Sequence, residues 1–197
     1  MARKKRIWYP GAIYHVISRG TRKAEIFKDH NDYIRFLEYL EKVRKMYPFD
    51  IHTLCLMTNH FHMLVETQDF DLSLIMQKFL SQYAQSFNLK YNYTGHLFES
   101  RYTASIIEDE SYFLEVSRYI HLNPVRANMV NEPQAYDYSS YRLFAADTND
   151  TEPDKFLELL SDMIDTDKAL QKFNLAPDQY RKFVENPPDG VRPPLQK

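Results

Sequence analysis

Two apolar runs joined by a two-residue connection constrain the fold most. Residues 51–57 and 60–66 are each long enough for a strand, and only Thr58-Asn59 lies between them. Two strands joined so tightly pair antiparallel in a hairpin, although this connection lacks the glycine that such turns favour. The chain is therefore expected to contain an antiparallel sheet.

The segments around this hairpin alternate between strand-like and helix-like patterns. Residues 12–18 and 102–107 are rich in β-branched and aromatic residues, which favour strands. Apolar residues at helical spacing predict helices over 29–47 and 71–91, and a third that Asp109 or Ser111 caps and that runs to about 122. This order predicts an α+β fold, a ferredoxin-like antiparallel sheet covered by helices.

The C-terminal quarter of the chain differs in composition from the rest. Residues 146–197 hold 11 Asp and Glu against 7 Lys and Arg, and they begin with a polar stretch. A short amphipathic helix is expected near 156–164 with up to two more after it, and the prolines beyond 186 predict a flexible end. We expect one domain over 1–145, followed by an acidic, mainly helical C-terminal extension over 146–197.

Bulk composition excludes several classes of protein. A chain of 197 residues with 44% hydrophobic residues can build a core, so disorder of the whole chain is excluded. The lone Cys55 cannot form an internal disulfide. No segment approaches the roughly 20 apolar residues that span a bilayer, and the basic start makes a poor signal peptide. These features predict a cytoplasmic protein with no membrane partner.

The hairpin carries a pair of histidines. Side chains alternate faces along a strand, so His60 and His62 point the same way and Phe61 points the other way. Two imidazoles on one face, two residues apart, can bind one metal ion. A purely structural role for the two histidines is the alternative.

A second group of polar side chains belongs to the helix predicted over 111–123. Tyr119 and Asn123 are four residues apart and would share a helix face. Pro124 biases Asn123 away from helical geometry, which predicts that Asn123 lies just past the last turn. Without further context, a tyrosine in such a helix is more often a core residue than a catalyst.

Four short sequence motifs carry a family resemblance. They are Tyr14-His15-Val16-Ile17-Ser18-Arg19-Gly20, Met57-Thr58-Asn59-His60-Phe61-His62-Met63-Leu64-Val65, Gly95-His96-Leu97-Phe98-Glu99-Ser100-Arg101-Tyr102 and Arg118-Tyr119-Ile120-His121-Leu122-Asn123-Pro124-Val125-Arg126-Ala127. Together they resemble the bacterial REP-associated tyrosine transposases, which are relatives of the insertion-sequence transposases with a His-hydrophobic-His motif and one catalytic tyrosine. The resemblance covers about residues 8–144, and it departs at Thr58, where such proteins often have proline.

The resemblance implies a role for each reactive group. His60, His62 and Asn123 would be metal ligands, and Tyr119 would be the nucleophile that forms a 5′-phosphotyrosine while a 3′-hydroxyl leaves. Two imidazoles alone favour zinc, nickel or copper, whereas the resemblance implies magnesium or manganese. Mn²⁺ satisfies both arguments best, with Mg²⁺ as the other candidate, and no organic cofactor is required. His15, His96 and His121 are then left without an obvious task.

Basic residues predict the DNA contacts. Residues 1–45 hold 12 Lys and Arg against 5 Asp and Glu, a net +7, although a merely solvated surface would show the same charge. The resemblance implies single-stranded DNA with a hairpin as the partner, and aromatic residues beside these cations are typical of single-strand binding. The candidate DNA-binding residues are Arg3, Lys4, Lys5, Arg6, Arg19, Arg22, Lys23, Arg101 and Arg126.

The function predicted is that of a transposase-like, metal-dependent single-stranded DNA endonuclease and strand transferase. Two alternatives stay open: a metal-dependent hydrolase that uses the two histidines to activate water, and a non-catalytic regulator that binds hairpin DNA. The sequence also leaves open whether the chain works as a monomer or a homodimer, and which DNA it cuts.

Overall fold

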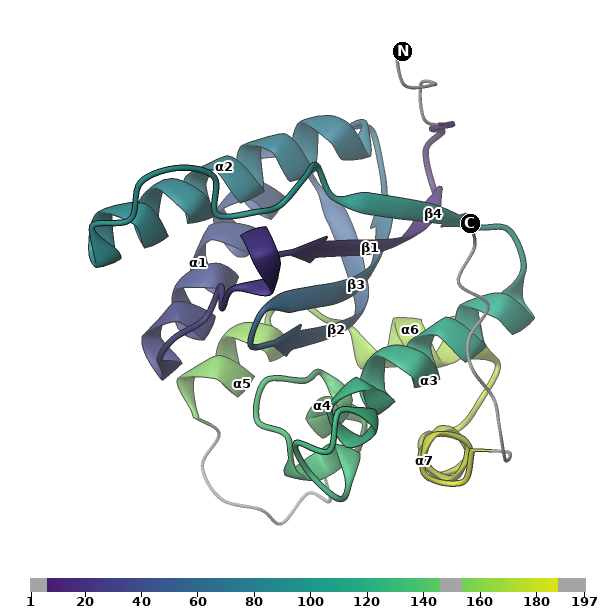
Figure 1. Ribbon diagram of the computed structural model, residues 1–197. Helices are drawn as coiled ribbons and strands as arrows, with labels where there is room; N and C mark the ends of the chain where they lie inside the picture. The colour runs from purple at the N-terminus through teal and green to yellow at the C-terminus, as the bar shows by residue number, and fades with distance from the viewer. Residues whose placement is uncertain (1–6, 146–153, 188–197) are drawn as a thin grey trace.

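A four-stranded antiparallel sheet lies at the centre of the fold (Figure 1). The computed structural model describes residues 7–145 and 154–187. The strands stand in the order β2-β3-β1-β4, with β3 paired to both β2 and β1. Their bounds are β1 Ile13–Arg19, β2 Phe49–Met57, β3 His60–Thr67 and β4 Thr103–Ile107. The predicted hairpin, the antiparallel sheet and the α+β class are confirmed.

Helices α1 (His30–Met46) and α2 (Leu72–Tyr91) cover one face of the sheet. Phe61 of β3 points into this layer, where its ring lies 5.1 Å from that of Phe36 and packs edge to face. Phe79 of α2 packs on Phe36 in the same way, at 4.7 Å. All three rings are fully buried, and each contributes about 1.5–3 kcal/mol by leaving water. This aromatic core fixes which face of β3 is left for His60 and His62.

Aspartates start the main helices, as their positions in the sequence predict. Asp29 accepts a hydrogen bond from the backbone N–H of Asp32, at 3.1 Å, and Asp32 returns the contact to complete a capping box. Asp109 accepts from the backbone N–H of Tyr112, at 2.7 Å, where α3 (Glu110–Arg126) begins. Each such cap stabilises its helix by about 1 kcal/mol. The second of these caps sets where the helix that bears Tyr119 starts.

The end of α3 differs from the prediction. The helix does not stop near residue 122 but continues to Arg126 with Pro124 inside it, so the expectation that Asn123 lies past the last turn is wrong. Proline removes one helical N–H bond and its ring crowds the carbonyl four residues earlier. The helix nevertheless continues, and its last turn is closed by the N–H of Ala127, which donates to the carbonyl of Asn123 at 3.0 Å. Asn123 is therefore a helical residue, one turn from Tyr119.

Short helices and turns complete the structure around the sheet. They are η1 Thr21–Lys23, η2 Pro133–Ala135, α4 Tyr141–Ala145, α5 Lys155–Ser161, α6 Thr166–Phe173 and α7 Pro177–Glu185. Helix α5 packs on α1, whereas α6 and α7 pack on α3 (Figure 1). The boundary predicted at residue 145 stays a prediction, since 146–153 lie outside the described residues. In the parts of the chain that the structure describes, no helix is both long and apolar enough to cross a membrane.

A buried polar network joins α7 to α3. The Tyr180 hydroxyl lies 2.8 Å from Nδ1 of His121 and 2.5 Å from Oγ of Ser117, both on α3. Nε2 of His121 lies 2.8 Å from Oγ of Ser140, which accepts the backbone N–H of Leu54 in β2. Burial lowers the pKa of His121 to about 3, so the ring is neutral at pH 7. The network holds α3 between the sheet and the C-terminal helices.

An ion-paired carboxylate ties the same layers together at the far end of the sheet. Glu66 of β3 accepts from Nε2 of His52 at 2.8 Å, and Nζ of Lys172 in α6 lies 3.0 Å away. These partners, the hydrogen bond from His52 first, lower the pKa of Glu66 to about 2. Because the folded pKa is depressed, this stabilisation is present above about pH 4.5 and is lost as the pH falls toward 2.

We therefore expect Glu66→Gln to lower the free energy of unfolding by about 1 kcal/mol at pH 6, and by clearly less at pH 3. Urea unfolding of both proteins at the two pH values measures this difference. An equal loss at both pH values would contradict the ion-pair account.

Candidate active site

Two imidazoles of β3 lie on the sheet face opposite the aromatic core. The rings of His60 and His62 are 5.1 Å apart between centroids and nearly perpendicular, at 80°. His62 is 4% exposed, whereas His60 is half-buried at the start of the strand. The pair thus has one ligand in the interior and one at the surface, as a site that admits a substrate from solvent requires.

Hydrogen bonds at Nδ1 orient both rings. The Nδ1–H of His60 donates to Oδ1 of Asn59 at 2.6 Å, because an amide oxygen can only accept. Nδ1 of His62 lies 3.1 Å from Nε2 of His15 in β1. Partners of this kind fix the tautomer and the rotation of a metal-binding histidine. The Nε2 atoms of His60 and His62 are thereby the ones available as ligands.

Burial keeps these imidazoles neutral. Loss of water lowers the pKa of His60 to about 4, and the positive charge of Arg19 lowers it further. The pKa of His62 lies well below its usual value for the same first reason, and burial lowers that of His15 to about 4. A neutral imidazole keeps a lone pair, which a metal ion needs. The pair is thus in its ligating form at neutral pH.

Helix α3 brings Tyr119 to this histidine pair. The Tyr119 ring meets that of His62 edge-on, 5.5 Å away at 90°, and lies 6.1 Å from that of His15. The guanidinium of Arg126 stands 5.2 Å from the Tyr119 centroid. Tyr119 remains half-buried, so its side chain is within reach of solvent. A phenol, two imidazoles and a cation, distant in sequence, therefore converge at one place.

Asn123 shares this side of α3. Its Nδ2 donates to the carbonyl of Tyr119 at 3.0 Å, which directs the amide along the helix and leaves Oδ1 as its ligating atom. Among residues 7–145 and 154–187, no group of three or more His, Cys, Asp or Glu side chains is placed to hold a metal ion. The predicted ligands are two histidines and one asparagine. A set that contains only two His, Cys, Asp or Glu side chains is not of the kind counted in that finding.

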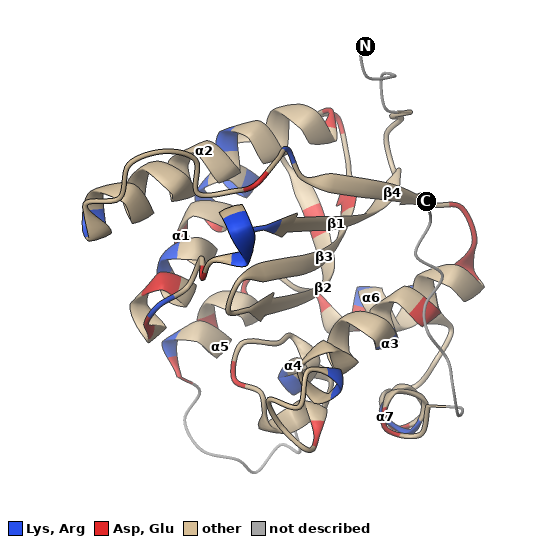
Figure 2. Cartoon of the chain, viewed as in Figure 1, with Lys and Arg blue, Asp and Glu red and all other residues tan. Residues whose placement is uncertain are grey.

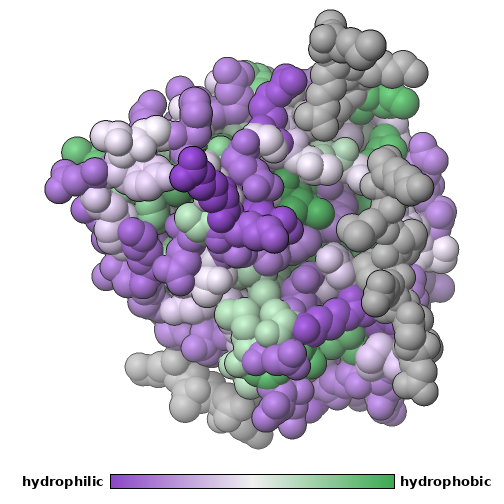
Figure 3. Space-filling view, viewed as in Figure 1, coloured by the Kyte–Doolittle hydropathy of each residue, from purple (hydrophilic) through white to green (hydrophobic). Residues whose placement is uncertain are grey.

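Of the basic residues predicted to bind DNA, Arg126 stands beside Tyr119, and the others that the structure describes lie near the end of β1 and before β4. Arg19 ends β1, and Arg22 and Lys23 project from η1 beside it, all three exposed (Figure 2). Hydrophilic side chains gather over η1 (Figure 3). Arg101 is exposed before β4. Arg3, Lys4, Lys5 and Arg6 lie outside the described residues.

The turn that presents these cations is held in an unusual backbone conformation. Arg22 and Lys23 both have positive φ, 55° and 61°, which costs a non-glycine residue roughly 1 kcal/mol or more. The Nδ2 of Asn59 donates to the carbonyl of Lys23 at 3.1 Å. A Cβ at Gly20 would stand 2.1 Å from the Ala24 carbonyl oxygen, so only glycine fits there. Asn59 thus connects the cationic turn to His60.

Two residues at this site were not expected from the sequence. The sequence pattern predicts no role for His15, but the structure shows that it contacts both His62 and Tyr119. The pattern predicts only a turn at Asn59, but this residue bonds His60 and the cationic turn. Each residue lies inside one of the four motifs that carry the family resemblance, and this position could have pointed to a role at the site. His121, by contrast, lies in the buried network behind α3, and His96 lies away from the histidine pair beside α2.

The fold and the site define an α+β protein in which a tyrosine on a helix faces histidines of two adjacent sheet strands. Residues 9–123 match the family described as "Transposase IS200 like", which is more than half of the chain. The protein belongs to this IS200-like transposase family.

Two solved structures resemble this chain, and the first of them has the same fold. One, described as the REP-associated tyrosine transposase bound to a REP hairpin, superposes with a TM-score of 0.62 at 17% identity, covering 78% of this chain and 96% of its own. A transposase-like protein from Deinococcus radiodurans gives a TM-score of 0.42 at 15% identity, covering 60% of this chain and 95% of its own. No curated protein sequence matches the chain.

Proposed function

We propose that this transposase-family protein is a metal-dependent single-stranded DNA endonuclease and strand transferase that uses Tyr119 as its nucleophile. The observation that carries the proposal is the edge-on contact between Tyr119 and His62, 5.5 Å between ring centroids. A core tyrosine would be enclosed by apolar side chains, whereas this one faces two neutral imidazoles and a guanidinium. The site therefore combines a nucleophile with imidazoles that can bind a metal ion and a guanidinium that attracts a phosphodiester.

The reaction follows from these groups. The phenolic oxygen of Tyr119 attacks the scissile phosphorus as the bond from phosphorus to the 3′-oxygen breaks, so the DNA 5′-phosphate becomes linked to the protein. One proton leaves the phenol and one joins the departing 3′-oxygen. In strand transfer, a 3′-hydroxyl attacks the phosphotyrosine and releases Tyr119. The guanidinium of Arg126, held beside the ring, is placed to attract the phosphate during both steps.

The residues present fit a divalent cation, Mn²⁺ or Mg²⁺. Nε2 of His60, Nε2 of His62 and Oδ1 of Asn123 would hold it, because their other polar atoms are already engaged. When bound, such an ion neutralises a non-bridging phosphate oxygen and orients the phosphate for in-line displacement. His15 and Asn59 act as positioning residues, since each contacts Nδ1 of a ligand.

DNA is held by the cations around the site. Arg19, Arg22, Lys23 and Arg101 would contact phosphates near the cut, and the N-terminal Arg3, Lys4, Lys5 and Arg6 would extend this contact. The strained turn supports this role, since left-handed backbone at charged residues is kept where it serves a site. The solved relative bound to a hairpin supports a hairpin as the partner. We further propose that residues 1–145 form the catalytic unit and that helices α6 and α7 of the C-terminal extension buttress α3.

The proposal predicts a covalent adduct that depends on Tyr119. Wild-type protein, incubated with Mn²⁺ and a labelled pool of hairpin DNA with randomised single-stranded flanks, should give a DNA–protein band on a denaturing gel. Tyr119→Phe should lose the band, because phenylalanine has no nucleophilic oxygen. Tyr112→Phe, on the same helix, is the matched control and should keep it.

Other outcomes separate the alternatives. Cleavage without an adduct, undiminished in Tyr119→Phe, would indicate a hydrolase that activates water at the histidines. Binding without cleavage, altered in His60→Ala only in affinity, would indicate a regulator. Either result contradicts the proposed function.

A second prediction concerns His15. His15→Leu removes the partner of His62 Nδ1 and should weaken Mn²⁺ binding by about 10- to 100-fold, whereas His15→Gln, which keeps an acceptor at that position, should restore most of the affinity. Calorimetric titration of Mn²⁺ into each protein measures this, with thermal unfolding in the absence of metal as the control. Equal affinities in the two variants would show that His15 only fills space.

A further inference from the structure

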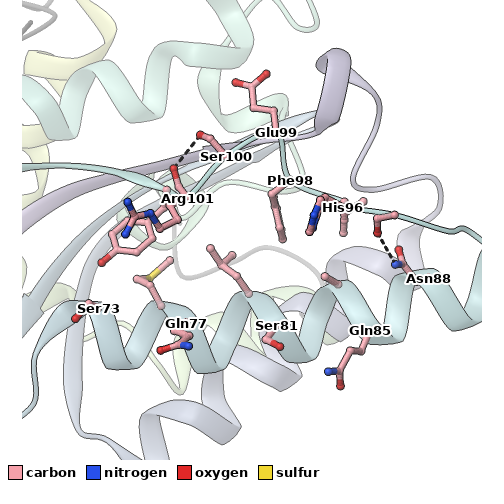
Figure 4. A pocket seen from close by; sticks show the side chains of 16 residues that line it. Ser73, Gln77, Ser81, Gln85, Asn88, His96, Phe98, Glu99, Ser100 and Arg101 are labelled. Carbon is pink, nitrogen blue, oxygen red and sulfur yellow. Dashed lines mark hydrogen bonds between the residues drawn. The ribbon is translucent and has the colours of Figure 1, made fainter. Parts of the chain in front are cut away.

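A groove runs along α2, outside the site described above. It has a volume of about 780 Å³ and lies between α2 and the segment 95–102 that leads into β4 (Figure 4). That segment is fixed to the sheet edge, because the N–H of Glu99 donates to the carbonyl of Arg19 at 3.0 Å and Gly20 bridges to Phe98. The groove is therefore a built feature of the described fold.

The floor of the groove is apolar and its rim carries neutral hydrogen-bonding groups. Met76, Leu80 and Ala84 of α2 form the floor, and Phe98 points toward α2 from the opposite segment (Figure 4). The rim on α2 repeats at helical spacing and consists of Ser73, Gln77, Ser81, Gln85 and Asn88. An apolar floor with a few polar groups above it is the general design of a site for a small organic group.

The charges around the groove narrow the class of ligand. Over its whole length α2 holds two lysines and no aspartate or glutamate. Arg101 lies at the opposite rim, and Glu99 points away from the groove in Figure 4. An anionic chain thus meets no carboxylate on the helix side. The amides on the rim carry no net charge, so they would not by themselves make a phosphate site.

Amide side chains read nucleobases well. Each carries a donor and an acceptor, which is the pattern that base edges present, and single-stranded bases are commonly stacked on apolar or aromatic surfaces while their edges are bonded. Gln77 and Gln85 are exposed, and no hydrogen bond within the described chain engages their amides. The Oδ1 of Asn88 is buried without a partner, although its Nδ2 donates to the Gly95 carbonyl.

The groove is within reach of the catalytic site. His60 pairs with Arg19 in the sheet register, and Arg19 bonds Glu99 on its other side. Neighbouring strands are about 4.8 Å apart, which puts the backbone of Glu99 about 10 Å from that of His60. A DNA strand crossing the edge at 99–101 would connect the groove with the histidine pair.

We infer that this groove binds unpaired nucleobases of the same DNA strand that Tyr119 cuts, and that Gln77 and Gln85 read their edges. This inference rests on the proposed single-stranded DNA substrate. It assigns base selection to α2, a helix that contributes no residue to the chemistry.

Single-stranded DNA affinity tests the inference without catalysis. The probe is a labelled random-sequence pool about 12 nucleotides long, a length typical of single-strand sites, and an abasic strand of equal length serves as its control, both in the absence of metal. The double variant Gln77→Ala/Gln85→Ala should bind the pool roughly tenfold more weakly than wild type. Both proteins should bind the abasic strand equally.

Two further variants sharpen the result. Ala84→Leu, which fills the floor and keeps both amides, should show the same loss, and Gln171→Ala, an exposed glutamine on α6, should show none. The inference would be overturned if the glutamine and Ala84→Leu variants bound the pool as tightly as wild type. It would also be overturned if wild type bound the pool and the abasic strand equally. An apolar or peptide partner would then be the occupant to seek.

Failure of this inference is distinguishable from failure of the proposed function. If wild type forms the Tyr119 adduct but the glutamine variants keep full affinity, the groove assignment fails alone. If wild type forms no adduct but loses affinity with the glutamines, the groove stands and the nuclease proposal fails.

Discussion

The contact between Tyr119 and His62 is the interaction on which the rest of this structure depends. It joins a helix to a sheet strand that is almost sixty residues earlier in the chain, and it does so without an ion pair or a covalent link. The geometry of this contact is set by the packing of neighbouring residues into the apolar core. Phe61, one residue from His62, is locked into the α1 and α2 layer, so the rotation of β3 is fixed by apolar burial. A strand turned by one residue would bury the histidines in that core.

The other half of the contact is set by what lies behind α3. Ser117 and His121 turn away from the site and meet Tyr180, while Arg118 pairs with Glu115 and stacks on Phe183 of α7. The family match ends at residue 123, so these C-terminal partners lie outside it. A nucleophile must be held to a fraction of an ångström to react efficiently. The C-terminal helices would supply that rigidity here by packing on the helix that bears Tyr119.

Local patterns predicted the fold well, because its elements are encoded within short segments. The hairpin, the helix starts at Asp29 and Asp109 and the facing of His60 and His62 all follow from neighbouring residues. The features that local patterns did not predict depend on contacts between segments far apart in the sequence. Ile17 pairs with His62 across β1 and β3, which places His15, two residues along the same face, against His62, and no property of His15 itself signals this. The passage of α3 through Pro124 was missed because tertiary packing outweighed a local bias.

The most direct measurement for this account is the position of a metal ion relative to Tyr119. Crystals of the protein grown with Mn²⁺ would locate the ion by its anomalous scattering. We predict one strong peak within coordination distance of Nε2 of both His60 and His62, on the side of the pair that faces Tyr119. A fully bound ion elsewhere, or one that contacts the Nδ1 atoms after His15 and Asn59 have moved away, would contradict it.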